Sequence, residues 1–118
     1  MRENIIKDKS FAFAVRIVKL CRYLQESKKE FVLSKQLLKS GTSIGAMVRE
    51  AEHGETKNDF IHKIAIAQKE ANETLYWLEL LKDTEYLSLA EFESINENAV
   101  EIIKIITNII KTAKNNNK

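Results

Sequence analysis

Proline is absent from this chain of 118 residues, and glycine occurs only three times. Sheet-rich and loop-rich folds need both residue types at their turns, so this scarcity favours a few long elements joined by short connections. Cys21 is the single cysteine, which excludes an internal disulfide and a metal site built from several cysteines. A lone thiol is typical of a reducing compartment, and we therefore expect a cytoplasmic protein.

Long apolar runs are also missing. No segment reaches about 18 uncharged apolar residues, and no apolar stretch of signal-peptide length follows the N-terminus. We therefore expect neither a membrane-spanning segment nor secretion through a signal peptide. The length fits one domain, residues 1–118, that buries a single continuous core.

Charge is nearly balanced, with a net value of +2 that does not by itself indicate a nucleic-acid-binding protein. Its distribution is uneven: residues 1–30 hold eight Lys or Arg against four Asp or Glu, and residues 56–85 hold four against six. A basic helix face can contact phosphate groups. A solvated helix face is the plainer interpretation of the same pattern.

Apolar residues recur at helical spacing in four segments. The predicted helices cover residues 9–27, 31–53, 57–83 and 89–113. Residues 114–118 form an Asn- and Lys-rich tail that we expect to be disordered. Short connections between long helices predict an all-α fold, an antiparallel up-down four-helix bundle.

Residues that begin or end helices support these boundaries. Asp8 is the expected N-cap of the first helix, and Gly54 is placed for a left-handed C-cap of the second. Thr56 begins the third helix, and Ser88 with Glu91 forms a capping box for the fourth.

Small residues cluster in the middle of the predicted second helix, at Ser40, Gly41, Ser43 and Gly45. Because glycine and serine lower helix propensity, a turn could divide this segment into two short helices. Alternatively, the small side chains let another helix approach closely. We favour a continuous helix because the apolar periodicity runs through the segment unbroken.

The apolar residues exceed what one small bundle can hide. The first helix carries two neighbouring apolar stripes, wider than the roughly 100° arc of an ordinary surface helix. The chain also contains many large aromatic side chains for its size, among them Phe11, Phe13, Tyr76, Trp77 and Phe92. Exposed apolar patches usually mark partner surfaces, so we expect a homo-oligomer, with a thick monomeric core as the alternative.

The sequence contains no complete residue pattern of a catalytic or metal site. Glu50 and His53 have the Glu-x-x-His spacing of a di-iron bundle, but the second such motif is absent. Cys21 falls within an apolar stripe, where a thiol acts as a small hydrophobic side chain. No phosphate-binding loop with Walker spacing occurs. We therefore expect no enzymatic activity, no cofactor and no metal.

Glu70 and Glu73 lie one turn apart among apolar residues of the predicted third helix. They either face water and pair with lysines at helical spacing, or lie at an interhelical or intersubunit seam and bond to Ser40, Thr42 or Ser43. We favour the seam. The candidate seam residues are Ser40, Gly41, Ser43, Gly45, Glu70, Glu73, Tyr76 and Trp77.

Two runs of residues, SGTSI at 40–44 and KEANETLYWLELL at 69–81, have Arg49-Glu50-Ala51 and Phe60 between them. In this combination the chain resembles the 23S rRNA intervening-sequence-encoded protein family, from the first helix to the end of the third. The fourth helix matches only in being apolar and periodic. Genes of that family often lie in insertions within bacterial large-subunit rRNA genes, hence its ribosomal-protein-like label.

The resemblance implies a four-helix bundle that assembles into a ring-shaped homopentamer. The chain is also similar to the accessory variability protein of diversity-generating retroelements, a basic pentameric bundle that binds reverse transcriptase and nucleic acid. Two departures stand out. Members commonly carry Asn at the position of Met47, and the net charge here is low.

RNA is the candidate partner that the resemblance adds. In that hypothesis Lys9, Arg16, Lys19 and Arg22 contact phosphates, and Tyr23 stacks on a base. Binding should then be weak, tolerant of sequence and steeply dependent on salt. The alternative is a protein–protein scaffold or adaptor with no nucleic-acid role.

Overall fold

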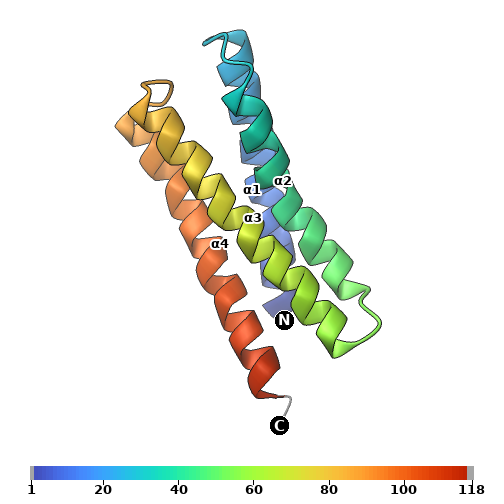
Figure 1. The fold of residues 1–118 in the computed structure, drawn as a ribbon. Helices are drawn as coiled ribbons and strands as arrows, with labels where there is room; N and C mark the ends of the chain where they lie inside the picture. The colour runs from blue at the N-terminus through green and yellow to red at the C-terminus, as the bar shows by residue number, and fades with distance from the viewer. Residues whose placement is uncertain (1, 117–118) are drawn as a thin grey trace.

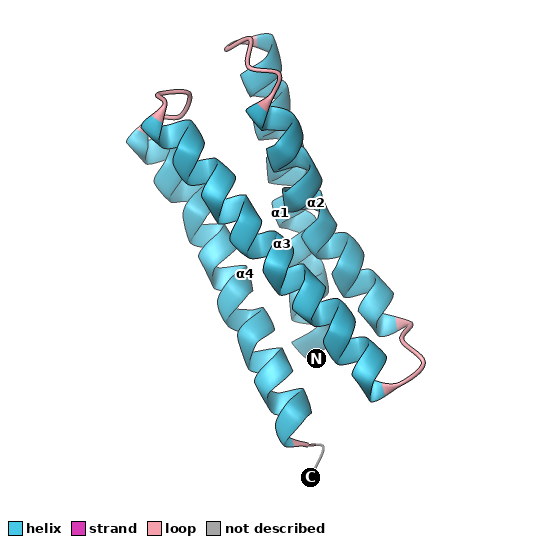
Figure 2. Ribbon diagram, viewed as in Figure 1, coloured by secondary structure: helices cyan, strands magenta, loops and turns pink. Residues whose placement is uncertain are grey.

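The computed structural model describes residues 2–116, and within this range the chain forms four helices and no strand (Figures 1 and 2). The helices are α1 (Arg2–Glu26), α2 (Leu33–Glu52), α3 (Lys57–Asp83) and α4 (Leu89–Asn115). The α1–α2 and α3–α4 connections lie at one end of the molecule, and the α2–α3 connection, the start of α1 and the end of α4 lie at the other (Figure 1). The molecule measures 50 × 21 × 20 Å.

Each helix buries one apolar stripe in a shared core. Contacts join α1 to α2, α2 to α3, α3 to α4 and α4 back to α1, and the contact between α1 and α4 is the sparsest. The largest fully buried side chains come from all four helices: Ile6, Phe13, Ile17, Leu24, Leu37, Ile44, Val48, Ile64, Leu78, Leu81, Ile102 and Ile106. Such a core holds the helices at fixed rotations, which decides the faces that remain outside.

The first and last helices, α1 and α4, are longer than the sequence pattern predicts. α1 begins at Arg2, so Asp8 lies inside the helix and is not its N-cap. The cause is Ile6, which precedes Phe13 by about two turns and is 2% exposed in the same core. At the other end of the chain, residues 114 and 115 are helical and do not belong to a disordered tail, while residues 117–118 lie outside the described residues.

α2 runs unbroken through residues 40–46, which confirms the continuous-helix interpretation. The hydroxyls of Thr42 and Ser43 donate to carbonyl oxygens of their own helix at 2.7 and 2.6 Å, so these polar groups need no outside partner. The left-handed C-cap at Gly54 is wrong, because no glycine among residues 2–116 has a positive φ. Instead the amides of His53 and Gly54 donate to carbonyls three residues earlier, both at 3.1 Å, which tightens the last turn.

The sequence analysis missed Glu30, a residue before α2 whose side chain caps the first amides of that helix. Its carboxylate accepts hydrogen bonds from the backbone N–H groups of Val32, Leu33 and Ser34 at 3.1, 2.9 and 2.7 Å. Burial of this carboxyl opposes ionisation, but the N–H donors of Leu33, Ser34 and Val32 outweigh it and hold the pKa of Glu30 below its ordinary value. Lys29, with φ 56°, turns the chain so that Glu30 reaches these amides.

The caps of α3 and α4 are the predicted ones. The Asp59 N–H donates to the Thr56 hydroxyl at 3.0 Å. Ser88 and Glu91 form the full capping box, with hydrogen bonds of 2.8 and 3.1 Å. These local signals fix the starts of both helices and with them the short α3–α4 connection.

Candidate nucleic-acid interface

The sparse contact between α1 and α4 leaves an open groove with a volume of about 530 Å³ along their junction. α1 supplies a basic and aromatic wall, and α4 supplies its first two turns. The lining residues are Arg16, Lys19, Leu20, Tyr23, Ala90, Glu91, Ser94 and Ile95. Three of the five side chains predicted to contact RNA therefore line one surface.

Arg16 is fixed across this groove by neutral partners. Its guanidinium donates to the backbone oxygen of Ser94 at 3.3 Å, to the Ser94 hydroxyl at 3.0 Å, and to the side-chain oxygen of Asn98. None of these groups is charged, so the positive charge is oriented and not neutralised. An oriented guanidinium with an open side is suited to a phosphate oxygen.

Lys9 and Lys19 differ in whether their positive charge is neutralised by an ion pair. Lys9 lies further along the α1–α4 junction and forms an ion pair with Glu101 at 3.1 Å. Both side chains are more than a third exposed, so the pair contributes little stability. Lys19 forms no ion pair within residues 2–116. Lys19 and Arg16 are thus the two uncompensated cations of the groove, with the carboxyl of Glu91 on its opposite wall.

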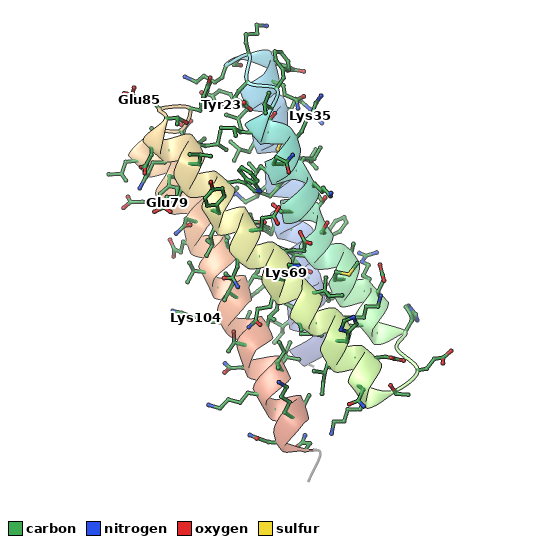
Figure 3. All side chains as sticks on the ribbon, in the orientation of Figure 1. Tyr23, Lys35, Lys69, Glu79, Glu85 and Lys104 are labelled. Carbon is green, nitrogen blue, oxygen red and sulfur yellow. The ribbon has the colours of Figure 1, made fainter. Side chains whose placement is uncertain are left out.

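Tyr23 and Arg22 point to different surfaces. Tyr23 is 36% exposed and lines the groove. It lies toward the end of the molecule that holds the α1–α2 connection (Figure 3). Arg22 is exposed but does not line the groove. It follows Val15 and Val18 at helical spacing on the outer side of α1, so the predicted RNA-contact set is split between two faces.

Ser94 and Asn98 are groove residues that the sequence analysis did not single out. They lie one turn apart on α4 and both bond Arg16. Their i, i+4 spacing places them on one face in the sequence alone, but which helix that face meets depends on the packing of the whole bundle.

The small residues of α2 lie at two different helix contacts. Gly41 is buried against Ile17 of α1, and Gly45 lies beside Ser10 of the same helix. Ser40 is buried on the α3 side, where its hydroxyl accepts from Thr74 at 3.0 Å. Small side chains therefore let α2 approach both neighbours closely.

The carboxylates assigned to the seam do not bond these serines. Thr74, which the sequence analysis did not assign, is the partner of Ser40, while Glu73 is exposed and accepts from the indole N–H of Trp77 at 3.2 Å. Glu70 is half-buried. A buried carboxylate is costly in free energy unless it is paired, whereas a buried hydroxyl needs only a hydrogen bond. Threonine is therefore a better buried partner for Ser40 than glutamate.

Tyr76 and Trp77 form an edge-to-face pair with ring centroids 4.9 Å apart. Tyr76 is 57% exposed, whereas Trp77 packs partly against the core. Tyr76 thus belongs to the outer surface of α3.

The described residues offer little support for a metal site, a reactive thiol or a membrane-spanning helix. Within residues 2–116, no set of three or more His, Cys, Asp or Glu side chains could hold a metal ion. Burial, with a smaller contribution from the charge of Glu30, raises the pKa of Cys21 to about 12, and the thiol donates to the Ser34 carbonyl at 3.2 Å. Cys21 is therefore the small core side chain that its position predicted. No helix in the described range has the length and apolarity needed to cross a membrane.

Comparison with known proteins decides the family. The family model for the 23S rRNA-intervening sequence protein matches residues 2–108. The chain belongs to this family. The crystal structure of a protein of unknown function from the S23 ribosomal protein family of Bacteroides thetaiotaomicron shares 58% sequence identity, covers 94% of this chain and 99% of its own, and superposes with a TM-score of 0.93.

Neither of these two descriptions names a catalytic activity. A search of curated proteins finds none that matches the chain. The resemblance drawn from the sequence is thus confirmed at the level of the family and of the four helices.

At the position of Met47 the resemblance to the family implies Asn. The Met47 side chain is half-buried and packs against the core from α2. A flexible thioether fills such a position without requiring a hydrogen-bond partner.

Proposed function

We propose that this chain is a non-catalytic, antiparallel up-down four-helix bundle that assembles with copies of itself and binds RNA weakly through the α1–α4 groove. The observation that carries the RNA-binding proposal is the pair of uncompensated cations, Arg16 and Lys19, beside Tyr23 along one open groove. Contacts to phosphate and stacking on a base are sequence-tolerant, which suits a site with few base-reading groups.

Only two of the four predicted cations, Arg16 and Lys19, are uncompensated in the groove, so it predicts a modest salt dependence in place of the steep one expected from the sequence. If Arg16 and Lys19 each neutralise one phosphate of a single strand, the logarithm of affinity should fall with a slope of about −1.4 against the logarithm of salt concentration. Raising salt from 50 to 200 mM should then weaken binding about sevenfold.

Fluorescence anisotropy with a labelled single-stranded RNA tests this proposal. Lys19→Ala should reduce the slope by about half and weaken binding at 50 mM salt. Lys104→Ala is the matched control, because it removes the same charge from an exposed position on α4 outside the groove (Figure 3). Absence of binding at 50 mM salt, or equal losses in the two variants, would contradict the groove as the RNA site.

Exposed apolar side chains support the proposal of self-association. Phe11, Tyr76 and Leu89 are 56%, 57% and 61% exposed, and Val15 and Val18 are each 38% exposed. Apolar surface of this kind is typical of interfaces between subunits. The family resemblance makes a ring-shaped homopentamer the specific expectation.

Light scattering coupled to size exclusion measures the assembly directly. A homopentamer has about five times the 13.6 kDa mass of the chain. A stable monomer at micromolar concentration would remove the self-association proposal and leave the RNA titration to stand separately.

A protein–protein adaptor is the second candidate function. It is favoured by the neutralisation of Lys9 and by Glu91 on the wall of the groove, both of which reduce attraction for phosphate. An oligomer that binds no RNA in the anisotropy experiment supports this candidate over RNA binding.

A further inference from the structure

Glu91 is the only carboxylate among the described residues that line the α1–α4 groove. Its Oε1 atom accepts a hydrogen bond from the Ser88 N–H at 2.8 Å, as part of the capping box that begins α4. Its other oxygen, Oε2, has no hydrogen bond or ion pair with the part of the chain that the structure describes. The capping box therefore holds the carboxylate in place and leaves one of its oxygens open to a ligand in the groove.

The register of α1 against α4 directs the Tyr23 ring and this carboxylate toward one level of the groove. Arg16 bonds Ser94 across the groove, and the end of α1 and the start of α4 lie at the same end of the molecule (Figure 1). One turn from this bond toward that end are Lys19 on α1 and Glu91 on α4, and Tyr23 follows one turn later. Helical side chains lean toward the N-terminus of their own helix, so Tyr23 leans toward the level of Lys19 and Glu91 leans toward the level of Tyr23.

The charges of the groove are divided between its two walls. The cations Arg16 and Lys19 lie on the α1 wall, and the Glu91 carboxylate lies on the α4 wall. Lys19 and Glu91 face each other without forming an ion pair, so both groups are available to a ligand. An RNA strand fits this division when its phosphates lie toward the cations and a neutral base lies toward the carboxylate, because a phosphate beside Glu91 would be repelled.

Guanine is the RNA base that best matches a carboxylate. An ionised carboxylate only accepts hydrogen bonds, and guanine presents two adjacent donors, N1–H and the N2 amine, on its Watson–Crick edge. Adenine and cytosine each present one amine beside a ring nitrogen whose lone pair repels a carboxylate. Uracil presents a single N–H between two carbonyl oxygens. Unpaired bases in RNA are commonly read on this edge while they stack on an aromatic side chain, and Tyr23 is the aromatic side chain in the groove.

We propose that the groove selects a guanine base of single-stranded RNA, which stacks on Tyr23 and donates its N1–H and N2 amine to the Glu91 carboxylate. This inference rests on the proposed RNA binding and names the base that the same site prefers. The groove volume of about 530 Å³ lies within the roughly 300–1,000 Å³ typical of sites for small molecules. Contacts to phosphate carry no sequence information, so Glu91 is the specificity-determining residue.

Fluorescence anisotropy with short RNA strands at about 50 mM salt tests the choice of base. The probes are a labelled uridine heptamer and the same strand with guanosine, inosine, adenosine or cytidine at its centre, so all of them carry equal charge. The guanosine strand should bind about fivefold more tightly than the uridine heptamer, the lower end of the discrimination by a bidentate base contact. Inosine lacks the N2 amine, so its strand should bind with an affinity between these two.

Glu91→Gln separates base reading from simple electrostatics. Glutamine also serves at this position of a capping box, so helicity measured by circular dichroism should stay unchanged. The variant loses the negative charge and replaces one acceptor oxygen with an NH₂ donor. The preference for guanosine should therefore be lost, while the uridine heptamer should bind at least as tightly as before. Glu93→Gln, which removes the same charge from an exposed position on α4 outside the groove, is the matched control and should keep the preference.

The guanine site and RNA binding fail in different ways. Equal affinity for all the strands, preference for another base, or an unchanged guanosine preference in Glu91→Gln would overturn the guanine site while RNA binding stands. An effect of Glu91→Gln that is equal for every strand would show that the carboxylate acts only through its charge, and would overturn the guanine site as well. Absence of binding to any strand would overturn both proposals.

Discussion

Gly41 offers a sharp test of how closely α1 and α2 approach. A Cβ atom added there would lie 2.8 and 2.9 Å from the Cγ1 and Cγ2 atoms of Ile17 and 3.1 Å from its Cδ1. Ile17 is 0% exposed, so it lies wholly within the packed core. At Gly45, one turn later, an added Cβ would lie 3.4 Å from the nearest atoms of Ser10, an ordinary contact. The two glycines therefore form a matched pair within one helix.

The expected difference in stability between Gly41→Ala and Gly45→Ala is found by cancelling the effect that both variants share. Either alanine gains about 1 kcal/mol of helix propensity over glycine, so this gain cancels between the two variants. Gly41→Ala alone overfills a packed core, which costs about 1–3 kcal/mol. At about 4 °C per kcal/mol for a domain of this size, the melting temperature of Gly41→Ala should fall about 4–12 °C below that of Gly45→Ala.

Thermal unfolding by circular dichroism, at one fixed protein concentration, measures this difference. In an Ile17→Ala background the three close contacts disappear, so Gly41→Ala should there be neutral or stabilising. Equal melting temperatures for Gly41→Ala and Gly45→Ala, or no change of sign in the Ile17→Ala background, would refute the close approach as the reason for glycine at this position.

Two further predictions concern buried groups. Because the folded pKa of Glu30 is lowered from 4.5, its stabilising effect should be complete above about pH 4.5 and should be lost as the pH falls through the folded value. Glu30→Gln should therefore lower the free energy of unfolding by about 1–3 kcal/mol at pH 7, and chemical denaturation repeated at acidic pH should show this gap shrinking; a constant gap would contradict the charged cap. The Cys21 thiol, with its pKa near 12, should resist a thiol reagent at pH 8 in the native protein and react once the chain is unfolded, and rapid native labelling would show that it is not buried as described.

The helices themselves could be predicted because their signals are local. Apolar spacing identified all four, and the Ser88–Glu91 capping box placed the start of α4 correctly. The errors at the ends have a common physical reason. Ile6 and Glu30 act through tertiary burial and through a loop bent at Lys29, and neither effect is visible in the periodicity of a single segment.

The candidate groove could be predicted only in part. The sequence gives each helix an inner and an outer side, but it does not determine which outer residues meet a neighbouring helix. Arg16 bonds Ser94 and Asn98 because α1 and α4 pack in one particular register. For the same reason the partner of Ser40 is Thr74, a residue that looks like any other threonine in the sequence.

The basic first helix is best understood as two surfaces on one element. Arg16 and Lys19 line the α1–α4 groove, whereas Arg22 lies on the outer side of α1 with Val15 and Val18. Residues three positions apart, such as Lys19 and Arg22, can therefore act on different partners. If the proposed RNA site holds, Lys19→Glu should weaken RNA binding, whereas Arg22→Glu, outside the groove, should weaken it less. Only the part of the positive charge of α1 that lines the groove would then serve RNA binding.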